Sequence, residues 1–506
     1  MDSTTNYPGQ LVMVDIEGTS LDANTAEFLR DHHIRAVCLF RKNLGTPDEV
    51  RQLTSDLCRV MGPLSLIGID QEGGSVIRVT FLPQAPAAMA LGATDDTELA
   101  EQVGAAVSRG LRSLGINWNF APVLDVNNNP ANPVIAERSF SADPHAVSRL
   151  AGAWMRGAMS EGVACCVKHF PGHGDTHTDS HHALPTVDKS LAQLEALELV
   201  PFRALADVAP AVMTAHIVYP QIDPEHPATL SHKVLTGILR DRIGYQGVVI
   251  TDALMMKAVY DRYGHARASV LTLQAGADLV LAQGARSEQL AALDAIGGAI
   301  AEGTLNARAM AQACARVDAL ARRFPVQVTA YSETDVAQDD DLMEYAWARS
   351  LTVVGAPKPP DVYAAIRVIA QGAVASDGVS EAGLPIQAVR ELFSAFADVE
   401  YLALPALRQL GASDVPRDAR LNVLVSNHRS RYTERAKHAA VDLHLVLWNP
   451  FQCMDIAAPA VVTWGYAAGA LFAAKAWLEG ELYAQGVAPV ALDHAYVNPK
   501  ILPPPS

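Results

Sequence analysis

Cysteine and long apolar runs are both scarce in this sequence of 506 residues. The six cysteines are scattered, and Cys165 and Cys166 are adjacent within an apolar segment. This usage is typical of reduced, buried thiols and speaks against a disulfide framework or a cysteine zinc site. No stretch approaches the roughly 20 uninterrupted apolar residues that a membrane span requires. The nearest candidate, 467–478, is short and interrupted by Lys475, so we expect no membrane partner.

Positive charge is also in deficit, because 39 basic residues stand against 55 acidic ones and leave a formal net charge of −16. A protein that binds nucleic acid needs a basic stripe to displace counterions, and the sequence contains none, so we expect no nucleic-acid partner.

The first ten residues, MDSTTNYPGQ, lack the basic stretch and apolar run of a secretory signal. Together with the expected reduced thiols, this favours a cytoplasmic location. The sequence leaves the oligomeric state open.

An alternation of short and long segments fills the chain up to about residue 325. Short apolar runs rich in Val and Ile are followed by longer amphipathic stretches, which predicts parallel strands joined by helices. Eight repeats at this length favour a (β/α)8 TIM-like barrel over residues 1–325, with a doubly wound open sheet as the alternative. The eight apolar runs are 11–16, 34–40, 64–69, 116–124, 163–167, 211–217, 248–250 and 278–282.

The rest of the chain has the pattern of a second, smaller domain. Residues 326–341 contain Ser, Thr, Gln and three consecutive Asp residues, a composition typical of a linker. Beyond them, 362–370, 421–425 and 443–447 resemble strands, and 387–396 and 467–478 resemble helices. We therefore expect residues 342–506 to form an α/β sandwich domain, and we find no evident catalytic cluster in it.

The densest polar segment runs from Lys168 to His182 and contains five histidines, at 169, 173, 177, 181 and 182. It follows the fifth apolar run, and in a barrel the carboxyl ends of the strands form the active-site face. Three interpretations stay open: a solvated loop, a metal site, and an acid/base pair of Asp179 and His181, in which the carboxylate orients the imidazole. The metal site is less favoured, because the first run ends in Asp15-Ile-Glu17 without a histidine ligand.

Other polar residues also follow strand-like runs. Asp252 comes after 248–250 and is either a nucleophile at a strand end or the cap of the next helix. Asp70 follows 64–69, and Asp70 and Arg78 lie on either side of a glycine pair that suits a tight turn near a ligand. Arg138 follows the Asn-rich stretch after 116–124 and, considered alone, would be read as a surface charge.

Taken together, these segments resemble the motifs of glycoside hydrolase family 3 β-N-acetylglucosaminidases. The resemblance covers about residues 10–325, and its most specific element is the KHFPGHG sequence followed by DSH. A weaker likeness to two-domain members extends over the second domain. The motifs that carry it occur in the order IDQEGG, APVLDVNNNP, ERSF, KHFPGHGDT with DSH, and ITDALMM.

The resemblance implies a barrel followed by an α/β sandwich domain, and it implies roles for single residues. Asp252 matches the catalytic nucleophile and His181 the general acid/base, with Asp179 as its partner. The residues that match the family's sugar-binding positions are Asp70, Arg78, Arg138, Lys168 and His169. The implied reaction is retaining hydrolysis of terminal β-linked N-acetylglucosamine from muropeptide fragments, without a cofactor or a metal.

Three alternatives remain at this stage. A family 3 phosphorylase would use the same residues, because a neutral histidine base tolerates an incoming phosphate better than a carboxylate would. A metal-dependent barrel hydrolase would use the histidine loop, and a non-catalytic protein would only bind the sugar.

Overall fold

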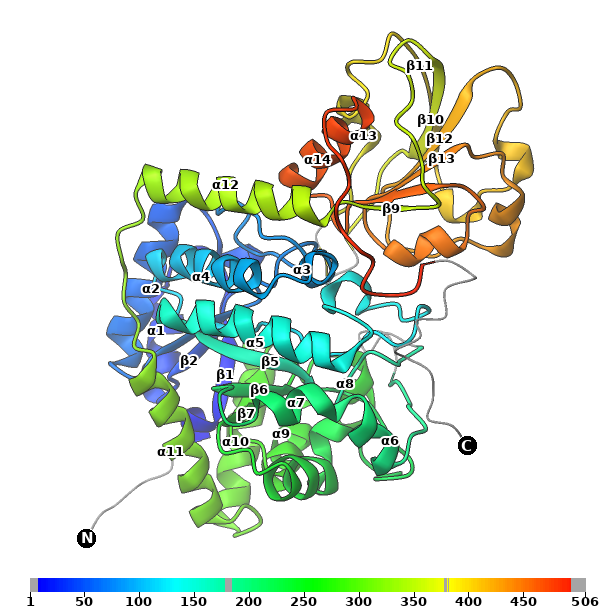
Figure 1. The fold of residues 1–506 in the computed structure, drawn as a ribbon. Helices are drawn as coiled ribbons and strands as arrows, with labels where there is room; N and C mark the ends of the chain where they lie inside the picture. Colours follow the sequence, from blue (N-terminus) through cyan, green and yellow to red (C-terminus); the bar gives the residue numbers. More distant parts are fainter. Residues whose placement is uncertain (1–7, 178–183, 377–379, 381, 493–506) are drawn as a thin grey trace.

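The computed structural model describes residues 8–177, 184–376, 380 and 382–492. Its N-terminal half is a barrel of eight parallel strands surrounded by helices (Figure 1). Each of the eight apolar runs overlaps one strand, so the predicted (β/α)8 fold is confirmed. The strands are β1 (Val12–Asp15), β2 (Ala36–Cys38), β3 (Leu66–Ile69), β4 (Trp118–Asn119), β5 (Ala164–Phe170), β6 (Ala211–Thr214), β7 (Val248–Ile250) and β8 (Val280–Ala282).

The barrel sheet has the order β7-β6-β5-β4-β3-β2-β1-β8, and its two ends meet at a single parallel bridge between Ile250 and Leu279. The Thr251 hydroxyl strengthens this closure by accepting the backbone N–H of Leu281 at 3.0 Å. A π-helical segment, η5 (Lys233–Arg242), follows β6. The α-helices around the barrel are α1 (Ala23–Asp31), α2 (Pro47–Met61), α3 (Ala88–Thr94), α4 (Thr97–Ser113), α5 (Pro144–Ser160), α6 (Leu191–Ala196), α7 (Leu199–Leu205), α8 (Lys257–Tyr263), α9 (His265–Ala275), α10 (Arg286–Ala301) and α11 (Ala307–Arg323).

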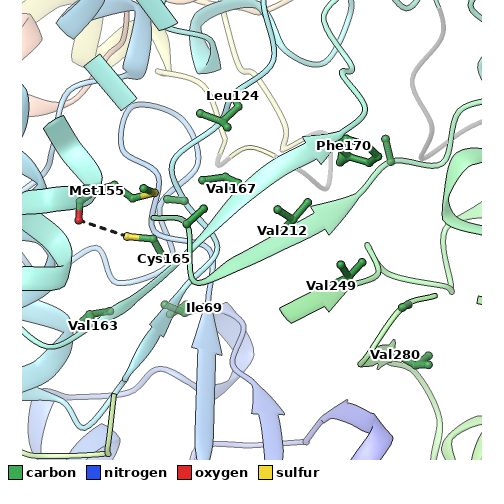
Figure 2. Close-up of a cluster of buried hydrophobic side chains, with 14 of the residues drawn as sticks. Ile69, Leu124, Met155, Val163, Cys165, Val167, Phe170, Val212, Val249 and Val280 are labelled. Carbon is green, nitrogen blue, oxygen red and sulfur yellow. Dashed lines mark hydrogen bonds between the residues drawn. The ribbon is translucent and has the colours of Figure 1, made fainter. Parts of the chain in front are cut away.

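Side chains along each barrel strand alternate between two buried clusters, as the two-residue period of a strand requires. One cluster joins the strands to the surrounding helices; in it, Val167 and Val249 lie with Met155 of α5 (Figure 2). The other cluster fills the barrel interior and contains Cys166 and Ile250.

All six cysteines are unpaired, and five of them are buried. None of the helices in the described part of the chain is both long and apolar enough to cross a membrane.

A second sheet of six strands forms the core of the C-terminal part, with the order β11-β10-β12-β13-β14-β9 and only β9 antiparallel. The predicted strands and helices of this part coincide with β10, β12, β13, α13 and α14, whereas β9, β11 and β14 had not been predicted. The elements are β9 (Thr352–Val354), β10 (Ala365–Gln371), α13 (Ile386–Glu391), β11 (Asp398–Leu404), β12 (Leu421–Ser426), β13 (Leu443–Val446), β14 (Ala460–Val462) and α14 (Ala468–Leu478).

The linker predicted over 326–341 requires a correction, because its second half belongs to helix α12 (Glu333–Ser350). Ser332 begins this helix with a capping box, in which its hydroxyl accepts the backbone N–H of Asp335 and the Asp335 carboxylate accepts the N–H of Ser332. The three consecutive Asp residues that suggested a linker therefore lie inside a helix, and Asp339 pairs with Arg109 of α4 at 2.5 Å. The domain limits stay a prediction.

The two parts share a buried apolar cluster, to which the barrel contributes Met89 and the second domain contributes Trp464 and Phe451. Residues 486–492, here called the return segment, run between the two parts (red in Figure 1). The backbone N–H of Val487 donates to the carbonyl of Ala93, and the carbonyl of Pro489 accepts the hydroxyl of Ser141 at 2.9 Å. The return segment is thus bonded directly to the barrel.

Candidate active site

The strand alternation determines which polar side chains point into the mouth of the barrel. On β5, Ala164 and Cys166 face the interior, and the next position in the same phase is Lys168. On β7, Val248 and Ile250 face the interior, and Asp252 follows them in phase. The same two-residue step places Asp70 two residues beyond Gly68 of β3. One ammonium group and two carboxylates therefore arrive at one layer from three strands.

A cavity of about 340 Å³ lies at this layer. Aromatic and thioether side chains form its apolar wall, including Phe40, Phe120, Met213 and Met255. This combination of an apolar wall and a few convergent polar groups is typical of a small-molecule site. The charged and histidine side chains that line the cavity are Asp70, Glu72, Arg78, Arg138, Lys168, His169, His173, Asp252 and Lys257.

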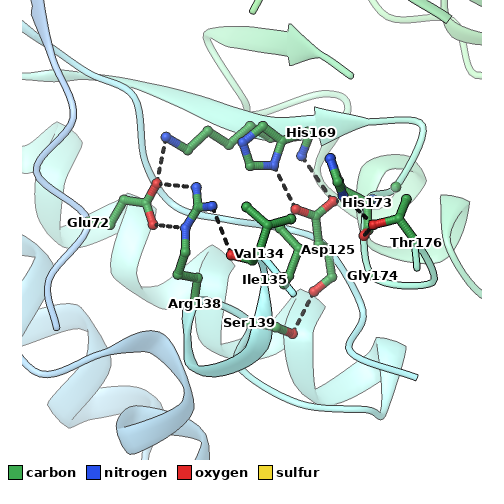
Figure 3. Close-up of polar contacts among 12 residues, drawn as sticks. Glu72, Asp125, Val134, Ile135, Arg138, Ser139, His169, His173, Gly174 and Thr176 are labelled. Carbon is green, nitrogen blue, oxygen red and sulfur yellow. Dashed lines mark hydrogen bonds and ion pairs between the residues drawn. The ribbon is translucent and has the colours of Figure 1, made fainter. Parts of the chain in front are cut away.

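A buried ion network forms one wall of the cavity (Figure 3). The Lys168 Nζ lies 2.6 Å from Asp70 Oδ1 and 2.6 Å from Glu72 Oε1. Arg138 pairs with both oxygens of Glu72, through Nη2 at 2.8 Å and Nε at 2.9 Å. The 3-10 turn Ala136–Arg138 delivers this arginine, and its Nη1 also donates to the carbonyl of Val134.

Mutual pairing keeps this network charged despite its burial. Burial disfavours the charge on Glu72, but the positive charges of Arg138 and Lys168 prevail and hold the pKa of Glu72 far below its usual range. Burial likewise disfavours the charge on Lys168, yet Asp70 and Glu72 raise the pKa of Lys168 above its ordinary value. The donors of this wall are therefore charged at neutral pH and held in place before a ligand arrives.

A second polar group lies at the start of the histidine loop and is centred on buried Asp125. Asp125 Oδ2 lies 2.7 Å from His169 Nδ1, and Asp125 Oδ1 accepts the backbone N–H of His169 and of His173. Burial raises the pKa of Asp125, but its electrostatic interactions and hydrogen bonds with His169 and His173 outweigh burial and leave this pKa below its usual value. Burial lowers the pKa of His173 to about 4, so its ring is neutral at neutral pH.

The segment after β7 positions Asp252. Asp252 Oδ1 accepts the backbone N–H of Ala253 at 2.7 Å. The carbonyl of Ala253 lies 3.0 Å from His216 Nε2, and the other nitrogen of that ring lies 2.8 Å from the Thr229 hydroxyl. His216 and Thr229 are buried, so the backbone that carries Asp252 is supported from the end of β6.

Six of the eight site residues predicted from the sequence line this one cavity: Asp70, Arg78, Arg138, Lys168, His169 and Asp252. The other two, Asp179 and His181, lie outside the described residues. Glu72 and Asp125 were not among the predicted site residues, although they lie inside the segments IDQEGG and APVLDVNNNP, respectively. Their partners, Arg138 and His169, are 66 and 44 residues away along the chain. No local sequence pattern indicates a pair of residues so far apart.

The base of the histidine loop bounds the mouth of the cavity. Hydrogen bonds and ion pairs fix the chain both where it enters the loop and where it leaves it. On the entry side, the Asn132 amide donates to the carbonyls of His173 and Gly174. On the exit side, Lys189 pairs with Asp175 at 2.6 Å and with the buried carboxylate of Glu198. Among the described residues, no group of three or more His, Cys, Asp or Glu side chains is arranged to hold a metal ion.

Comparison with known families identifies the barrel. The model described as the glycosyl hydrolase family 3 N terminal domain matches residues 5–320. The chain belongs to glycosyl hydrolase family 3. The match covers all eight barrel strands and the cavity at their ends, so the prediction of a family 3 glycoside hydrolase is confirmed.

Relatives of this family 3 chain are named as hexosaminidases. The beta-hexosaminidase of Chromobacterium violaceum is 40% identical over 284 residues, which cover 54% of this chain and 79% of that protein. The beta-hexosaminidase A of Pseudoalteromonas piscicida is 36% identical over 340 residues, or 61% of this chain. That match spans only 56% of the length of the Pseudoalteromonas protein.

A solved structure resembles both parts of the family 3 chain. It is a glycoside hydrolase family 3 beta-N-acetylglucosaminidase from Paenibacillus sp. str. FPU-7, which is 33% identical and superposes with a TM-score of 0.87. The superposition covers 98% of this chain and 100% of that one. The arrangement of barrel and second sheet is therefore shared with a known two-part enzyme.

Proposed function

We propose that this chain is a retaining exo-β-N-acetylglucosaminidase that releases terminal, non-reducing, β-linked N-acetylglucosamine from cell-wall muropeptide fragments. The observation that carries the proposal is the single cavity at the carboxyl ends of the barrel strands, which Asp252 shares with the paired donors Lys168 and Arg138. The hexosaminidase relatives and the resemblance to a beta-N-acetylglucosaminidase support the choice of sugar.

In the proposed mechanism, Asp252 attacks the anomeric carbon and His181 protonates the departing glycosidic oxygen. This step forms a glycosyl-Asp252 ester and releases the aglycone. His181, oriented by Asp179, then accepts a proton from water as the water attacks the same carbon and frees the carboxylate. Two displacements at one carbon leave the product in the β configuration.

The described residues would bind and orient the sugar. Asp70, Arg78 and Lys168 offer charged acceptors and donors to its hydroxyl groups. Lys168 and Arg138 are already fixed by Glu72, so orienting them costs little when the sugar binds. A sugar that leaves these buried groups unpaired would be discriminated against, because each unsatisfied group is costly in a buried site.

The decisive test is the hydrolysis of an aryl N-acetyl-β-glucosaminide beside the matching glucoside and N-acetylgalactosaminide, with the anomer of the first product read by NMR. We expect hydrolysis of the glucosaminide with retention of the β configuration. Asp252→Ala should remove turnover of every substrate, whereas Asp261→Ala, at an exposed position on α8, should not. Near-normal activity of Asp252→Ala would contradict the assignment of Asp252 as the nucleophile.

A second test concerns the acid/base. His181→Ala should slow natural glycosides by about 10²- to 10⁴-fold, the range of general acid catalysis. It should slow the first step much less for an activated aryl leaving group, which needs no proton. Equal losses for both kinds of substrate would remove His181 from this role.

Phosphorolysis by the same residues is separated from hydrolysis by analysing the product in phosphate and in a non-nucleophilic buffer. The proposal requires free N-acetylglucosamine in both buffers, and a sugar 1-phosphate in phosphate buffer would overturn it.

We place the reaction in the cytoplasm, a reducing compartment in which the six unpaired cysteines would stay reduced.

A further inference from the structure

A second cavity, of about 590 Å³, lies between the barrel and the C-terminal part. We call it the interdomain cavity. Residues 131–133 of the barrel form one wall. The opposite wall comes from the ends of β10 and β12 and from the segments after β11 and β13, which contribute Gln371, His428, Arg408 and Asn449. The cavity is therefore lined by both parts of the molecule.

The position of this cavity follows from the sheet topology. In the order β11-β10-β12-β13, the chain leaves β10 towards one side to form β11 and then crosses to the other side to form β12. Ligands of open α/β sheets bind outside the carboxyl ends of the strands at such a switch point, because the two departing segments diverge there. Asn427 braces this point: its amide nitrogen donates to the carbonyl of Gln371 and its amide oxygen accepts the N–H of Gln371.

The lining of the interdomain cavity is cationic. Arg408, Arg429 and Arg431 all line it, and the described residues that line it include no Asp or Glu. Arg431 is paired with Asp455 at 2.6 Å and Arg429 donates to the carbonyl of Val134. The exposed guanidinium of Arg408 has no ion-pair partner among the described residues.

A buried histidine reports the same positive field. His428 is 4% exposed, and its Nε2 has no hydrogen-bond partner among the described residues. Burial, assisted by the positive charge of Arg408, lowers the pKa of His428 to about 4. The positive charge that Arg408 adds beside this cavity attracts an anion.

Only a short segment separates this cavity from the candidate active site. Residues 131–133 line the interdomain cavity, and Val134 and Ile135 line the barrel cavity. Arg138 of the active site and Arg429 of the second domain both donate to the carbonyl of Val134, at 3.2 and 2.5 Å. A ligand long enough to pass this segment would reach both cavities.

We propose that the interdomain cavity binds the carboxylate groups of an acidic aglycone while the terminal sugar occupies the barrel cavity. This inference rests on the proposed function, because it assigns the second cavity to the leaving part of the same substrate. Arg408 is the main cationic contact.

The test compares two substrates with the same terminal sugar, an N-acetylglucosaminyl-muramyl peptide with several carboxylates and neutral chitobiose. Arg408→Glu should lower kcat/KM for the acidic substrate by about tenfold or more, the range expected for losing a charge-assisted hydrogen bond. Chitobiose should change by less than about twofold, because surface substitutions away from the contact cost little. The matched control is Arg322→Glu, an exposed charge reversal on α11.

Equal losses for both substrates, or no loss for either, would overturn the inference. The preference of the unsubstituted protein for the acidic substrate should also shrink when salt is raised to about 1 M, where exposed charges are screened. Failure of the proposed function is distinguishable, because the unsubstituted protein would then cleave neither substrate. In that case calorimetric titration with the free muramyl peptide still decides: weaker binding to Arg408→Glu supports the cavity, and identical binding refutes it.

Discussion

At the scale of single residues, Glu72 holds the candidate site together, because it is the common partner of two buried cations. Lys168 and Arg138 are 2% and 6% exposed, and both contact the same carboxylate. A buried charge that loses its partner is strongly destabilising. The role of Glu72 is therefore to stabilise two buried positive charges in the wall of a sugar-sized cavity.

Replacing this carboxylate by an amide of the same shape tests that role. Glu72→Gln should lower the free energy of unfolding by about 3 kcal/mol, the lower end of the cost of breaking a buried ion pair. Denaturant unfolding measures the change, and Glu302→Gln at an exposed position of the barrel should change it by less than about 0.5 kcal/mol. Equal stability of the two variants would show that the pairing contributes nothing.

The sequence predicted the residues that follow strand ends and missed their distant partners. Asp70, Lys168 and Asp252 could be found because each lies within two residues of the end of an apolar run, and the strand period places all three on the inner face. Glu72 and Asp125 could not be assigned, because their functions depend on Arg138 and His169. Only tertiary folding brings those residues within hydrogen-bonding distance.

At the scale of elements, the base of the histidine loop depends on Lys189, which joins Asp175 on the entry side to Glu198 near the start of α7. Glu198 is 1% exposed, and burial raises its pKa despite the charge of Lys189. Without Lys189 the pKa of Glu198 should rise further, since no cation would offset the burial.

Relative to the unsubstituted protein, the variant Lys189→Met should therefore lose more stability at pH 7 than at pH 5. A carboxyl whose pKa is raised in the folded state binds more protons folded than unfolded, so stability falls as pH rises above the unfolded value of about 4.3. Urea unfolding at the two pH values measures this, with Lys437→Met, at an exposed lysine paired with Glu434, as the control. A loss of stability that is the same at both pH values would contradict the role given to Glu198.

Elements were predictable in proportion to their burial. The eight barrel strands are buried on both faces and therefore appear as apolar runs. In the second sheet, two of the three residues of β9 and all residues of the edge strand β11 are at least partly exposed, so these strands leave little hydrophobic signal. The strand β14 is an exception, because it is buried throughout and was still not predicted. The capped helix α12 was hidden by its acidic residues.

At the scale of the whole molecule, three buried histidines make stability depend on pH. The pKa is lowered to about 4 in His173 and His428 and to about 3 in His444, in each case chiefly by burial. A histidine with a lowered folded pKa favours the neutral form, so its contribution is complete above the unfolded value of about 6.5 and is lost as pH falls towards the folded value.

We therefore expect the midpoint of thermal unfolding to fall as pH decreases from about 6.5 to 4, before most carboxylates titrate. Differential scanning calorimetry across this range measures the slope. His444→Asn should make the slope shallower, whereas His145→Asn, at an exposed position on α5, should leave it unchanged. An unchanged slope in His444→Asn would remove the buried imidazole as its cause.

The sequence predicted two domains but not the way they are joined. The shared cluster combines Met89 of α3 with Trp464 and Phe451 of the second domain, and none of these positions differs in pattern from an ordinary core residue. Trp448 also crosses the boundary, since its indole N–H donates to the buried carboxylate of Glu137 at 2.9 Å.

The bond between Ser141 and Pro489 joins residues that are 348 positions apart. The barrel is complete only at Arg323, the end of α11. At a translation rate of roughly 5–20 residues per second, it must therefore wait about 8–33 s until Pro489 has been synthesised. During this interval the face around Met89 has no cover, and a chaperone has its best opportunity to bind there.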